Sequence, residues 1–218
     1  QGSLYNVDMT AHSNFRPTRI VLASNNPGKL REFSALFEPL GIQLVPQGEL
    51  GVPEAPEPHV TFLENALAKA RHASAITGLP ALADDSGLCV SALDDAPGVL
   101  SARFAAQAGG EKSDAANNAL LLERLSNVPD GARNARFVCV LALARPDGSL
   151  ALSVRGEARG RIAFAARGTR DFGYDPLFVF DEPGHPQTGR GFAELEPNDK
   201  DAVSHRGRAL RELARLLP

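Results

Sequence analysis

The sequence predicts an α/β fold in which helices flank a mixed β-sheet, arranged as two lobes around a central cleft. Two observations support this class. Residues 19–45 read as a short apolar strand, a helical pattern and a second strand, which is typical of a parallel crossover unit. Residues 136–156 hold two apolar runs on either side of Pro146-Asp147-Gly148, a strong hairpin signal. A chain with both features is expected to build a sheet with parallel and antiparallel pairs.

The first half of the chain supplies the crossover unit and a second helix. Leu30, Phe33 and Leu36 recur at helical spacing, and Gly41 is placed to end that helix. Thr61 has the spacing to Glu64 of a capping box, so a second helix is expected to begin there. The expected elements, in chain order, are a strand at 19–23, a turn at 24–28, a helix at 30–40, a strand at 42–45, a surface loop at 46–59 and a helix at 61–77.

The stretch from 81 to 93 reads as two short strands separated by a turn. Residues 81–83 are apolar and run straight into Asp84 and Asp85, after which Ser86-Gly87 has turn composition and residues 88–93 are apolar again. The later elements expected are a helix from Ser113 or Asp114 to about Leu125, strands at 136–144, 150–156 and 177–180, a loop at 183–191, and a C-terminal helix marked by Leu210, Leu213, Leu216 and Leu217.

The composition limits the classes of partner. The chain has 218 residues, 43% of them apolar and 22% charged, with a formal net charge of −3. This balance argues against binding nucleic acid or an anionic membrane through bulk charge, but a small anion held by a few Lys and Arg residues stays open. No apolar run approaches the roughly 18–20 residues of a membrane span. Cys89 and Cys139 stand alone in apolar runs, which favours buried thiols in a reducing cytoplasm over a disulfide or metal site.

The chain is expected to form one folded unit. Residues 17–218 are expected to make a single two-lobed domain, and residues 1–16 a disordered N-terminal segment. Residues 1–8 precede Met9, the only methionine, and read as a remnant of expression. No internal repeat or low-complexity tract divides the remainder.

The acid pair Asp84-Asp85 is the sharpest local feature of the chain. Two carboxylates at the carboxyl end of an apolar strand lie where open α/β sheets place ligands. Adjacent carboxylates repel each other, so the pair needs a cation or raised pKa values, and hard oxygen ligands of this kind suit Mg²⁺. The alternative is a solvated turn in which both acids cap Ser86-Gly87, and the pair alone does not decide between the two.

The loop at residues 24–29 follows a strand and opens a helix, a position that suits an anion. Free backbone N–H groups, the helix dipole and Lys29 could receive a phosphate chain there. The loop is no Walker A motif, because the first glycine is absent and Leu30 stands where Ser or Thr would hold the metal. The alternative is an ordinary turn with a helix N-cap.

The second helix offers weaker candidates. Asn65 and Lys69 are four residues apart and share a helix face, although a solvated face explains them equally well. Glu57, just before this helix, could supply another oxygen ligand, with Glu54 as its rival.

Two segments of the second half could bind a base. The aromatic turn at 172–178 could sandwich a purine and accept hydrogen bonds through Asp175, or simply close the core. His205 and Arg206, at the start of the last helix, could read base oxygens or phosphates, or form a basic cluster on the surface.

Taken in order, these segments resemble the Ham1-like inosine triphosphate pyrophosphatase family. Each motif is modest alone, but six in the family's order and spacing make a specific signal from Arg19 to the C-terminus. The matching segments are residues 24–29, 61–66, 83–88, 96–98 with 101–104, 172–176 and 204–207. The resemblance implies an elongated mixed sheet, a nucleotide cleft between two lobes, and a homodimer. It also implies hydrolysis of ITP, dITP and XTP to the monophosphate and pyrophosphate with Mg²⁺, which cleanses the nucleotide pool.

The resemblance also assigns roles to individual positions. Asp85 matches the family's catalytic acid, with Lys69 and Asp84 expected beside it, and Asp85 and Glu57 are expected to hold the metal. The positions expected to contact the substrate are Ser24, Asn25, Asn26, Pro27, Gly28, Lys29, Asn65, Ser86, Arg103, Phe172, Gly173, Tyr174, Asp175, Lys200, His205 and Arg206. Two alternatives stay open: a Maf-like nucleotide pyrophosphatase of different base preference, and a nucleotide sensor that binds without hydrolysis.

Overall fold

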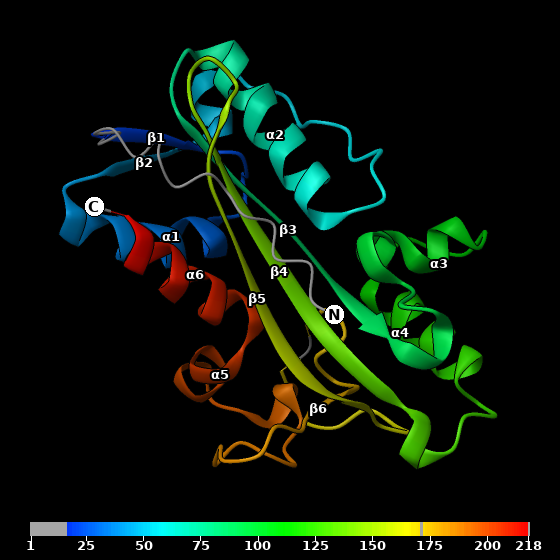
Figure 1. The fold of residues 1–218 in the computed structure, drawn as a ribbon. Coiled ribbons are helices and arrows are strands. Elements are labelled where there is room, and N and C mark those ends of the chain that lie inside the picture. Colours follow the sequence, from blue (N-terminus) through cyan, green and yellow to red (C-terminus); the bar gives the residue numbers. More distant parts are fainter. Residues whose placement is uncertain (1–16, 171, 218) are drawn as a thin grey trace, which may run out of the picture.

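A six-stranded mixed sheet runs the length of the molecule, with helices on both of its faces (Figure 1). The computed structural model describes residues 17–170 and 172–217, so the expected disorder of residues 1–16 lies outside the described residues. The strands are β1 (Arg19–Leu22), β2 (Gln43–Pro46), β3 (Ala81–Val90), β4 (Asn134–Ala144), β5 (Leu150–Ile162) and β6 (Phe178–Phe180). The helices are α1 (Pro27–Phe37), α2 (Phe62–Thr77), α3 (Phe104–Gln107), α4 (Asp114–Arg124), α5 (Pro197–Val203) and α6 (His205–Leu216).

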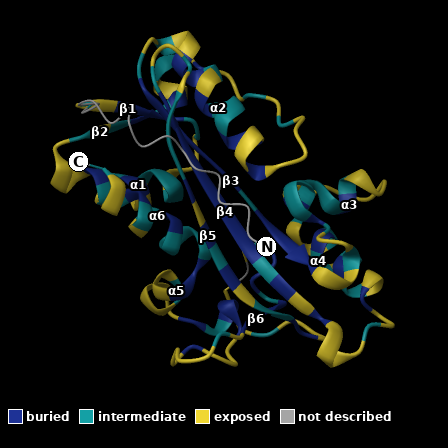
Figure 2. Ribbon diagram, viewed as in Figure 1, coloured by how far each residue is buried: buried dark blue, intermediate teal, exposed yellow. Residues whose placement is uncertain are grey.

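The strand order confirms the predicted mixed sheet. The order across the sheet is β2-β1-β3-β4-β5-β6. The pairs β2–β1 and β1–β3 are parallel, as the crossover unit requires, whereas β3–β4, β4–β5 and β5–β6 are antiparallel. The expected hairpin therefore lies between β4 and β5. Strand β4 is buried along most of its length, whereas β5 is buried at only a few positions (Figure 2).

Strand β3 is a single strand of ten residues, so the predicted turn at Ser86-Gly87 is wrong. The whole strand from Ala81 to Val90 pairs with β4, and Asp84 and Asp85 stand opposite Leu141 and Val140. Residues with turn propensity can occupy a strand when a neighbouring strand supplies the pairing, because strand preference depends strongly on context. The acid pair consequently lies in the middle of β3 and not at its end.

The partner of β3 on its other edge is much shorter. Strand β1 pairs with β3 only through Val21↔Ala81 and Leu22↔Leu82. Beyond Leu82 no strand in the described part of the chain pairs with this edge, until an isolated bridge joins Cys89 to Pro97. The acid pair therefore lies just past the carboxyl end of the short parallel strand, where the sheet leaves an edge open.

Alternation along β3 sends neighbouring side chains to opposite faces. Leu82 packs on one face with a cluster drawn from α1 and α6, including Phe33, Phe37 and Leu213. Ala83 packs on the other face against Ala70 of α2. A further core lies at the opposite end of the sheet, where Leu88, Leu121, Phe137, Phe178 and Phe192 meet.

Helix boundaries follow the capping residues. The Thr61 hydroxyl accepts a hydrogen bond from the Glu64 N–H at 3.2 Å, and Gly78 ends α2 with a φ of 67°. Gly41, with a φ of 69°, ends the short 3₁₀ segment after α1. Both positions need glycine because a side chain disfavours the left-handed conformation.

One element extends beyond its predicted limit, and another was not predicted. Strand β5 continues from the expected end at Gly156 to Ile162, because Val154, Gly156 and Ala158 face the core while Arg155 and Arg159 are exposed. Helix α5 was not predicted, since its seven residues carry little apolar periodicity.

Cys89 and Cys139 are both free and buried, as predicted. No helix in the described ranges is long and apolar enough to cross a bilayer.

Gly87 generates a stability prediction, because the fold needs close approach at this position. A Cβ placed there would lie 2.3 Å from the Gly98 carbonyl oxygen and 2.6 Å from the Ser101 Oγ. We expect Gly87→Ala to lower the free energy of unfolding by about 1–3 kcal/mol, as overpacked core sites do. Urea denaturation of the variant and of the wild-type protein measures this difference in the free energy of unfolding. The control is Gly131→Ala, where a Cβ meets nothing within 4 Å; equal stability of the two variants would contradict this account.

Candidate active site

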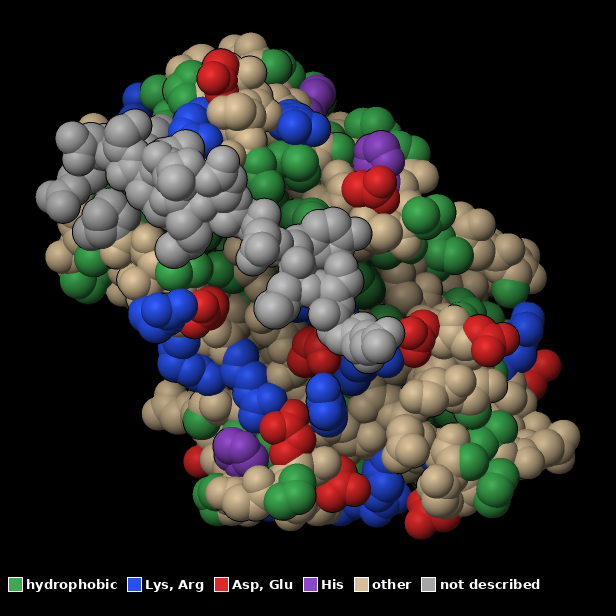
Figure 3. All heavy atoms as spheres, in the orientation of Figure 1, with side chains coloured by type: hydrophobic (Ala, Val, Ile, Leu, Met, Phe, Trp, Pro, Cys, Tyr) green, Lys and Arg blue, Asp and Glu red, His purple; other side chains and the backbone are tan. Residues whose placement is uncertain are grey.

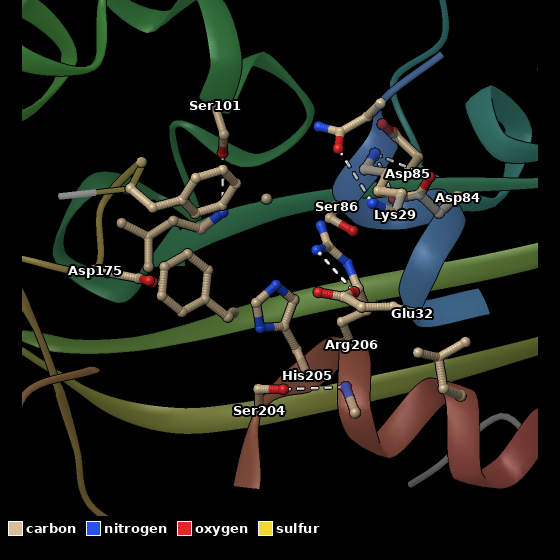
Figure 4. Close-up of a pocket in the computed structure, with 18 of the residues that line it drawn as sticks. Lys29, Glu32, Asp84, Asp85, Ser86, Ser101, Asp175, Ser204, His205 and Arg206 are labelled. Atoms are coloured by element: carbon tan, nitrogen blue, oxygen red, sulfur yellow. Dashed lines mark hydrogen bonds and ion pairs between the residues drawn. The ribbon is translucent and has the colours of Figure 1, made fainter. Parts of the chain in front are cut away.

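A cavity of about 730 Å³ lies along the open edge of β3. Its walls come from both faces of the sheet, because no strand of the described residues covers this edge beyond Leu82. The lining includes Lys29 and Glu32 of α1, Lys69 of α2, Asp84 to Leu88 of β3, Phe172 to Asp175, and Ser204 to Gly207 at the start of α6. Figure 3 shows acidic and basic side chains gathered across the middle of one face of the molecule, and Figure 4 shows the cavity residues converging from β3, α1 and α6.

A second hollow, of about 430 Å³, adjoins the first and is mostly polar. The two share Asn26, Lys29, Glu57, Lys69 and Asp84. Ser24, Asn25, Glu54, Arg103 and Lys112 also line the second hollow. Asp84 is thus located where the two spaces meet, with a strongly charged region on one side and an aromatic region on the other, and Asp85 beside it lines the larger cavity.

Asp85 lies on the α2 face and is only 7% exposed. Its Oδ2 accepts a hydrogen bond from Asn65 Nδ2 at 3.3 Å, and its Oδ1 lies 3.5 Å from Lys69 Nζ. Lys69 Nζ also donates to Glu57 Oε1 at 2.7 Å. Burial raises the pKa of Asp85 to about 6; the negative charge of Glu57 adds to this effect, while Lys69 opposes it. Asn65 and Lys69 lie on one face of α2, as their spacing predicted, and both contact Asp85. With its raised pKa, Asp85 can take up a proton near neutral pH.

Asp84 has a different environment, on the α1 and α6 face. Lys29 Nζ donates to both of its oxygens, at 3.0 and 2.9 Å (Figure 4). Burial alone would raise the pKa of Asp84, but the positive charges of Lys29, Arg206 and Lys69 lower it to about 2. Strand alternation thus gives each acid its own neighbouring lysine, Lys29 for Asp84 and Lys69 for Asp85, although the charge of Lys69 also acts on Asp84.

The loop at 24–29 is held differently from the prediction. Asn26 Oδ1 accepts hydrogen bonds from the N–H groups of Gly28 and Lys29, at 2.8 and 3.1 Å, and Ser24 Oγ accepts from Asn26 N–H. Asn25 Oδ1 accepts from Gly48 N–H at 2.8 Å. Helix α1 begins at Pro27, and its first free N–H groups are bonded to the Asn26 side chain. This agrees with the N-cap alternative and not with a loop whose N–H groups are free for an anion. What the loop offers an anion is the side chain of Lys29.

The aromatic turn divides into buried and exposed members. Tyr174 is 5% exposed and donates its hydroxyl to the Ser101 carbonyl at 2.8 Å, whereas the Phe172 ring is exposed at the cavity. Asp175 is buried and paired with Lys200. Burial raises the pKa of Asp175, and the charge of Lys200 opposes the shift. The structure thus separates Phe172 from Tyr174, two residues that the sequence placed together.

His205 and Arg206 open α6, as predicted, with Ser204 as the N-cap. The His205 ring stacks on Phe137 at 4.7 Å, and burial lowers the pKa of His205 to about 3, so the ring is neutral at physiological pH. A Cβ on Gly156 would lie 2.0 Å from the His205 carbonyl, so glycine at this point of β5 lets α6 approach the sheet.

Two polar atoms of residues that line the cavity are buried and lack a hydrogen-bond partner among the described residues. They are His205 Nδ1 and Arg206 Nε. Buried polar groups are normally paired, and unpaired ones carry a cost of about 1–3 kcal/mol each. Their common location makes them candidates for contact with a bound molecule.

The structure brings further residues to the site that the sequence did not single out. Glu32 contacts Arg206, with Oε2 lying 3.4 Å from Nη1, and Ser101 Oγ accepts from Leu88 N–H at 2.9 Å. Glu32 lies one helical turn beyond Lys29, a spacing that could have drawn attention to it. Ser101 belongs to the segment 101–104 that resembles the Ham1-like family, but the sequence predicted no role for it at the site. Arg103 Nη1 lies 3.5 Å from Glu57 Oε2, so this predicted residue supports the Glu57 loop.

The donor set fits a hard divalent cation held partly by substrate. Within the described ranges no group of three His, Cys, Asp or Glu side chains is arranged to hold a metal. Asp85 and Glu57 both contact Lys69 and lie close enough for Glu57 to raise the pKa of Asp85. Two carboxylates completed by phosphate oxygens are what Mg²⁺ commonly takes. Glu54 lines the adjoining hollow but is not joined to Asp85 through Lys69, so the geometry favours Glu57.

The Asp84–Lys29 pair predicts a pH-dependent contribution to stability. The folded pKa of about 2 lies below the ordinary 3.8, so ionised Asp84 stabilises the fold above about pH 4 and loses this effect as the pH falls towards 2. We expect Asp84→Asn to cost about 2 kcal/mol at pH 7, measured by urea denaturation, and progressively less between pH 4 and pH 2.

The control for this variant is Asp130→Asn, which removes an exposed ion pair to Arg161. A change of less than about 0.5 kcal/mol is expected there. A loss in Asp84→Asn that stayed constant down to the lowest pH would show that the charge of Asp84 is not the cause.

Known proteins match almost the whole chain. A sequence model of the Ham1 family matches residues 20–216. A protein of Burkholderia pseudomallei named dITP/XTP pyrophosphatase is 61% identical over 197 residues, covering 90% of this chain and 91% of that protein. The solved structure of a HAM1 protein from Coxiella burnetii matches with a TM-score of 0.83 and 46% identity, covering 91% of this chain and 98% of that one.

A third match agrees with these two. The crystal structure of a nucleoside-triphosphatase, dITP/XTP pyrophosphatase, from Mycobacterium abscessus has a TM-score of 0.74 and 48% identity, over 92% of this chain and 98% of that one. Sequence identities of 46–61% over nine-tenths of the chain, together with the shared fold, show that these proteins are homologous to this chain. The chain belongs to the Ham1 family.

Proposed function

We propose that this protein hydrolyses the non-canonical purine nucleoside triphosphates ITP, dITP and XTP to the monophosphate and pyrophosphate. The observation that carries the proposal is the position of Asp85. This buried carboxylate, with its pKa raised to about 6, lines the larger cavity and contacts Lys69, which lines both the cavity and the polar hollow. The names of the relatives in Burkholderia and Mycobacterium support the same activity.

The polar hollow suits the triphosphate. Lys29, Lys69, Arg103 and Lys112 line it, so a chain of phosphates would meet several cations there. Lys29 and Lys69 already neutralise Asp84 and Asp85, and phosphate oxygens are similar acceptors for their ammonium groups. With phosphates in this hollow, the base extends into the larger cavity.

Asp85 acts as the general base in this proposal. It takes a proton from a water molecule whose oxygen attacks the α-phosphorus, and the bond from that phosphorus to the bridging oxygen breaks. Pyrophosphate leaves with the electron pair of that bond, and the proton remains on Asp85. Asn65 and Lys69 hold the carboxylate in place.

Asp85 and Glu57 would hold Mg²⁺ together with phosphate oxygens. When bound, the metal supplies charge neutralisation at the triphosphate. The two carboxylates lie close enough to repel each other, and a divalent cation relieves that repulsion.

The aromatic end of the cavity suits recognition of a 6-oxopurine. The exposed Phe172 ring would stack on the base, while Arg206 and the neutral His205 read its edge. A guanidinium group only donates hydrogen bonds, so it pairs with the 6-oxo oxygen of hypoxanthine or xanthine and not with the 6-amino group of adenine. The unpaired Arg206 Nε and His205 Nδ1 would gain partners on binding. The homodimer and the cytoplasmic location stay predictions.

A pyrophosphate-release panel tests the proposed activity. With Mg²⁺, we expect ITP, dITP and XTP to be hydrolysed at least about tenfold faster than ATP or dTTP, because a misplaced polar edge leaves buried groups unpaired. GTP is included as the 6-oxopurine that carries a 2-amino group, and omission of Mg²⁺ should abolish turnover. Equal rates on all nucleotides would refute the role. Binding of ITP without release of pyrophosphate would instead support a nucleotide sensor.

Replacement of Asp85 tests its role in the reaction. We expect Asp85→Asn to lower kcat on ITP by at least about 100-fold, since a positioned general base contributes about 10²–10⁴-fold. Thermal denaturation should show a folded protein, because Asn keeps the size of the side chain. Asp130→Asn, outside the cavity, serves as the control and should keep full activity. Near-normal turnover by Asp85→Asn would remove this residue from the mechanism.

A further inference from the structure

Helix α4 holds the backbone of the aromatic turn at a single residue. Asp114 Oδ2 accepts a hydrogen bond from Gly173 N–H at 2.8 Å, and Asn118 Nδ2 donates to the Gly173 carbonyl, also at 2.8 Å. The two side chains are four positions apart and so lie on one face of α4. Together they bind both backbone polar groups of Gly173, as a neighbouring strand would.

The held residue is the neighbour of Phe172. The Phe172 side chain is 58% exposed, and Lys200 Nζ lies 5.6 Å from the centre of its ring. Tyr174, on the other side of Gly173, is anchored by burial and by its own hydrogen bond to Ser101. Packing therefore fixes Tyr174 but leaves the Phe172 ring largely uncovered. The turn backbone that carries this ring is held at Gly173 by α4 and at the Phe172 carbonyl by the Asp175 N–H at 3.0 Å.

The capping of α4 does not need these two side chains. Ser113 is the N-cap and accepts from Ala116 N–H at 3.1 Å, so Asp114 is available for the turn. The Oδ1 of Asn118 is buried without a partner in the described part of the chain, while its Nδ2 is used on Gly173. An unpaired buried carbonyl oxygen lowers stability, so the presence of Asn118 at this position indicates a role outside the helix.

We propose that Asp114 and Asn118 are positioning residues that hold the Phe172 ring at the cavity in the orientation that receives the base. This inference rests on the proposed function for the identity of the ligand. A preorganised ring spares the nucleotide the entropic cost of ordering it. The effect should fall on KM and not on kcat, because in the proposed function the reacting phosphates bind beside Asp85 and not beside Phe172.

A fluorescence measurement tests the positioning without any activity. The chain contains no tryptophan, so Phe172→Trp introduces a single reporter in the full-length protein. In that background Asp114→Ala and Asn118→Ala should each lower the tryptophan anisotropy, whereas Asp114→Asn, which keeps an acceptor, should restore it. Glu123→Ala, an exposed acid on the last turn of α4, is the control and should change nothing. Unchanged anisotropy in both alanine variants would overturn the proposal.

Kinetics with ITP then test whether the two residues act through Phe172. We expect Asn118→Ala to raise KM about tenfold, the effect of one lost hydrogen bond, with kcat changed less than about twofold. In a Phe172→Ala background the same substitution should have little further effect, because coupled residues are not additive. Full additivity would assign Asn118 a merely structural role. If the wild-type protein does not hydrolyse ITP, the proposed function fails, while the anisotropy still decides the positioning.

Discussion

The site depends on one mismatch of strand length. β3 has ten residues and β1 has four, so their pairing ends at Leu82 while β4 continues along the other edge of β3 to Val90. A sheet normally keeps its two faces apart. Where the neighbour is missing, groups from both faces reach the same strand edge, and α2 can contribute to one space with α1 and α6. The cleft is therefore a gap in the sheet and not a groove on its surface.

The same strand also gives two identical side chains opposite properties. Alternation directs Asp84 to the face of Lys29 and Arg206, where cations hold its pKa at about 2, and directs Asp85 to the face of α2, where burial and Glu57 raise its pKa to about 6. One acid is then a permanent anion that fixes the lysine of the first loop, and the other can exchange a proton. Environment and not residue type distinguishes the structural carboxylate from the one suited to acid–base chemistry.

The sequence predicts those features that depend on local signals. The limits of α2 follow from Thr61 and Gly78, and the hairpin follows from Pro146-Asp147-Gly148, because capping and turn chemistry act within a few residues. The spacing of Asn65 and Lys69 likewise places both beside Asp85. The continuity of β3 could not be predicted, since Ser86-Gly87 reads as a turn until β4 pairs with it. The hydrogen bond between Asp114 and Gly173 joins residues 59 positions apart, so no local sequence pattern could predict it.

The continuity of β3 also restricts how this cleft can change. Inserting or deleting a single residue between Leu82 and Asp85 would turn the strand by one position and exchange the faces of the two acids. A deletion would place Ser86 where Asp85 now stands, so Asn65 and Lys69 would lose their carboxylate. An insertion would place Asp84 there and leave Lys29 without its partner. Diversification of the site is thus confined to the loops that carry Glu57 and Phe172, where length can vary without reversing the strand. A designer who wishes to alter the base preference should begin with those loops and leave the ten-residue strand at constant length.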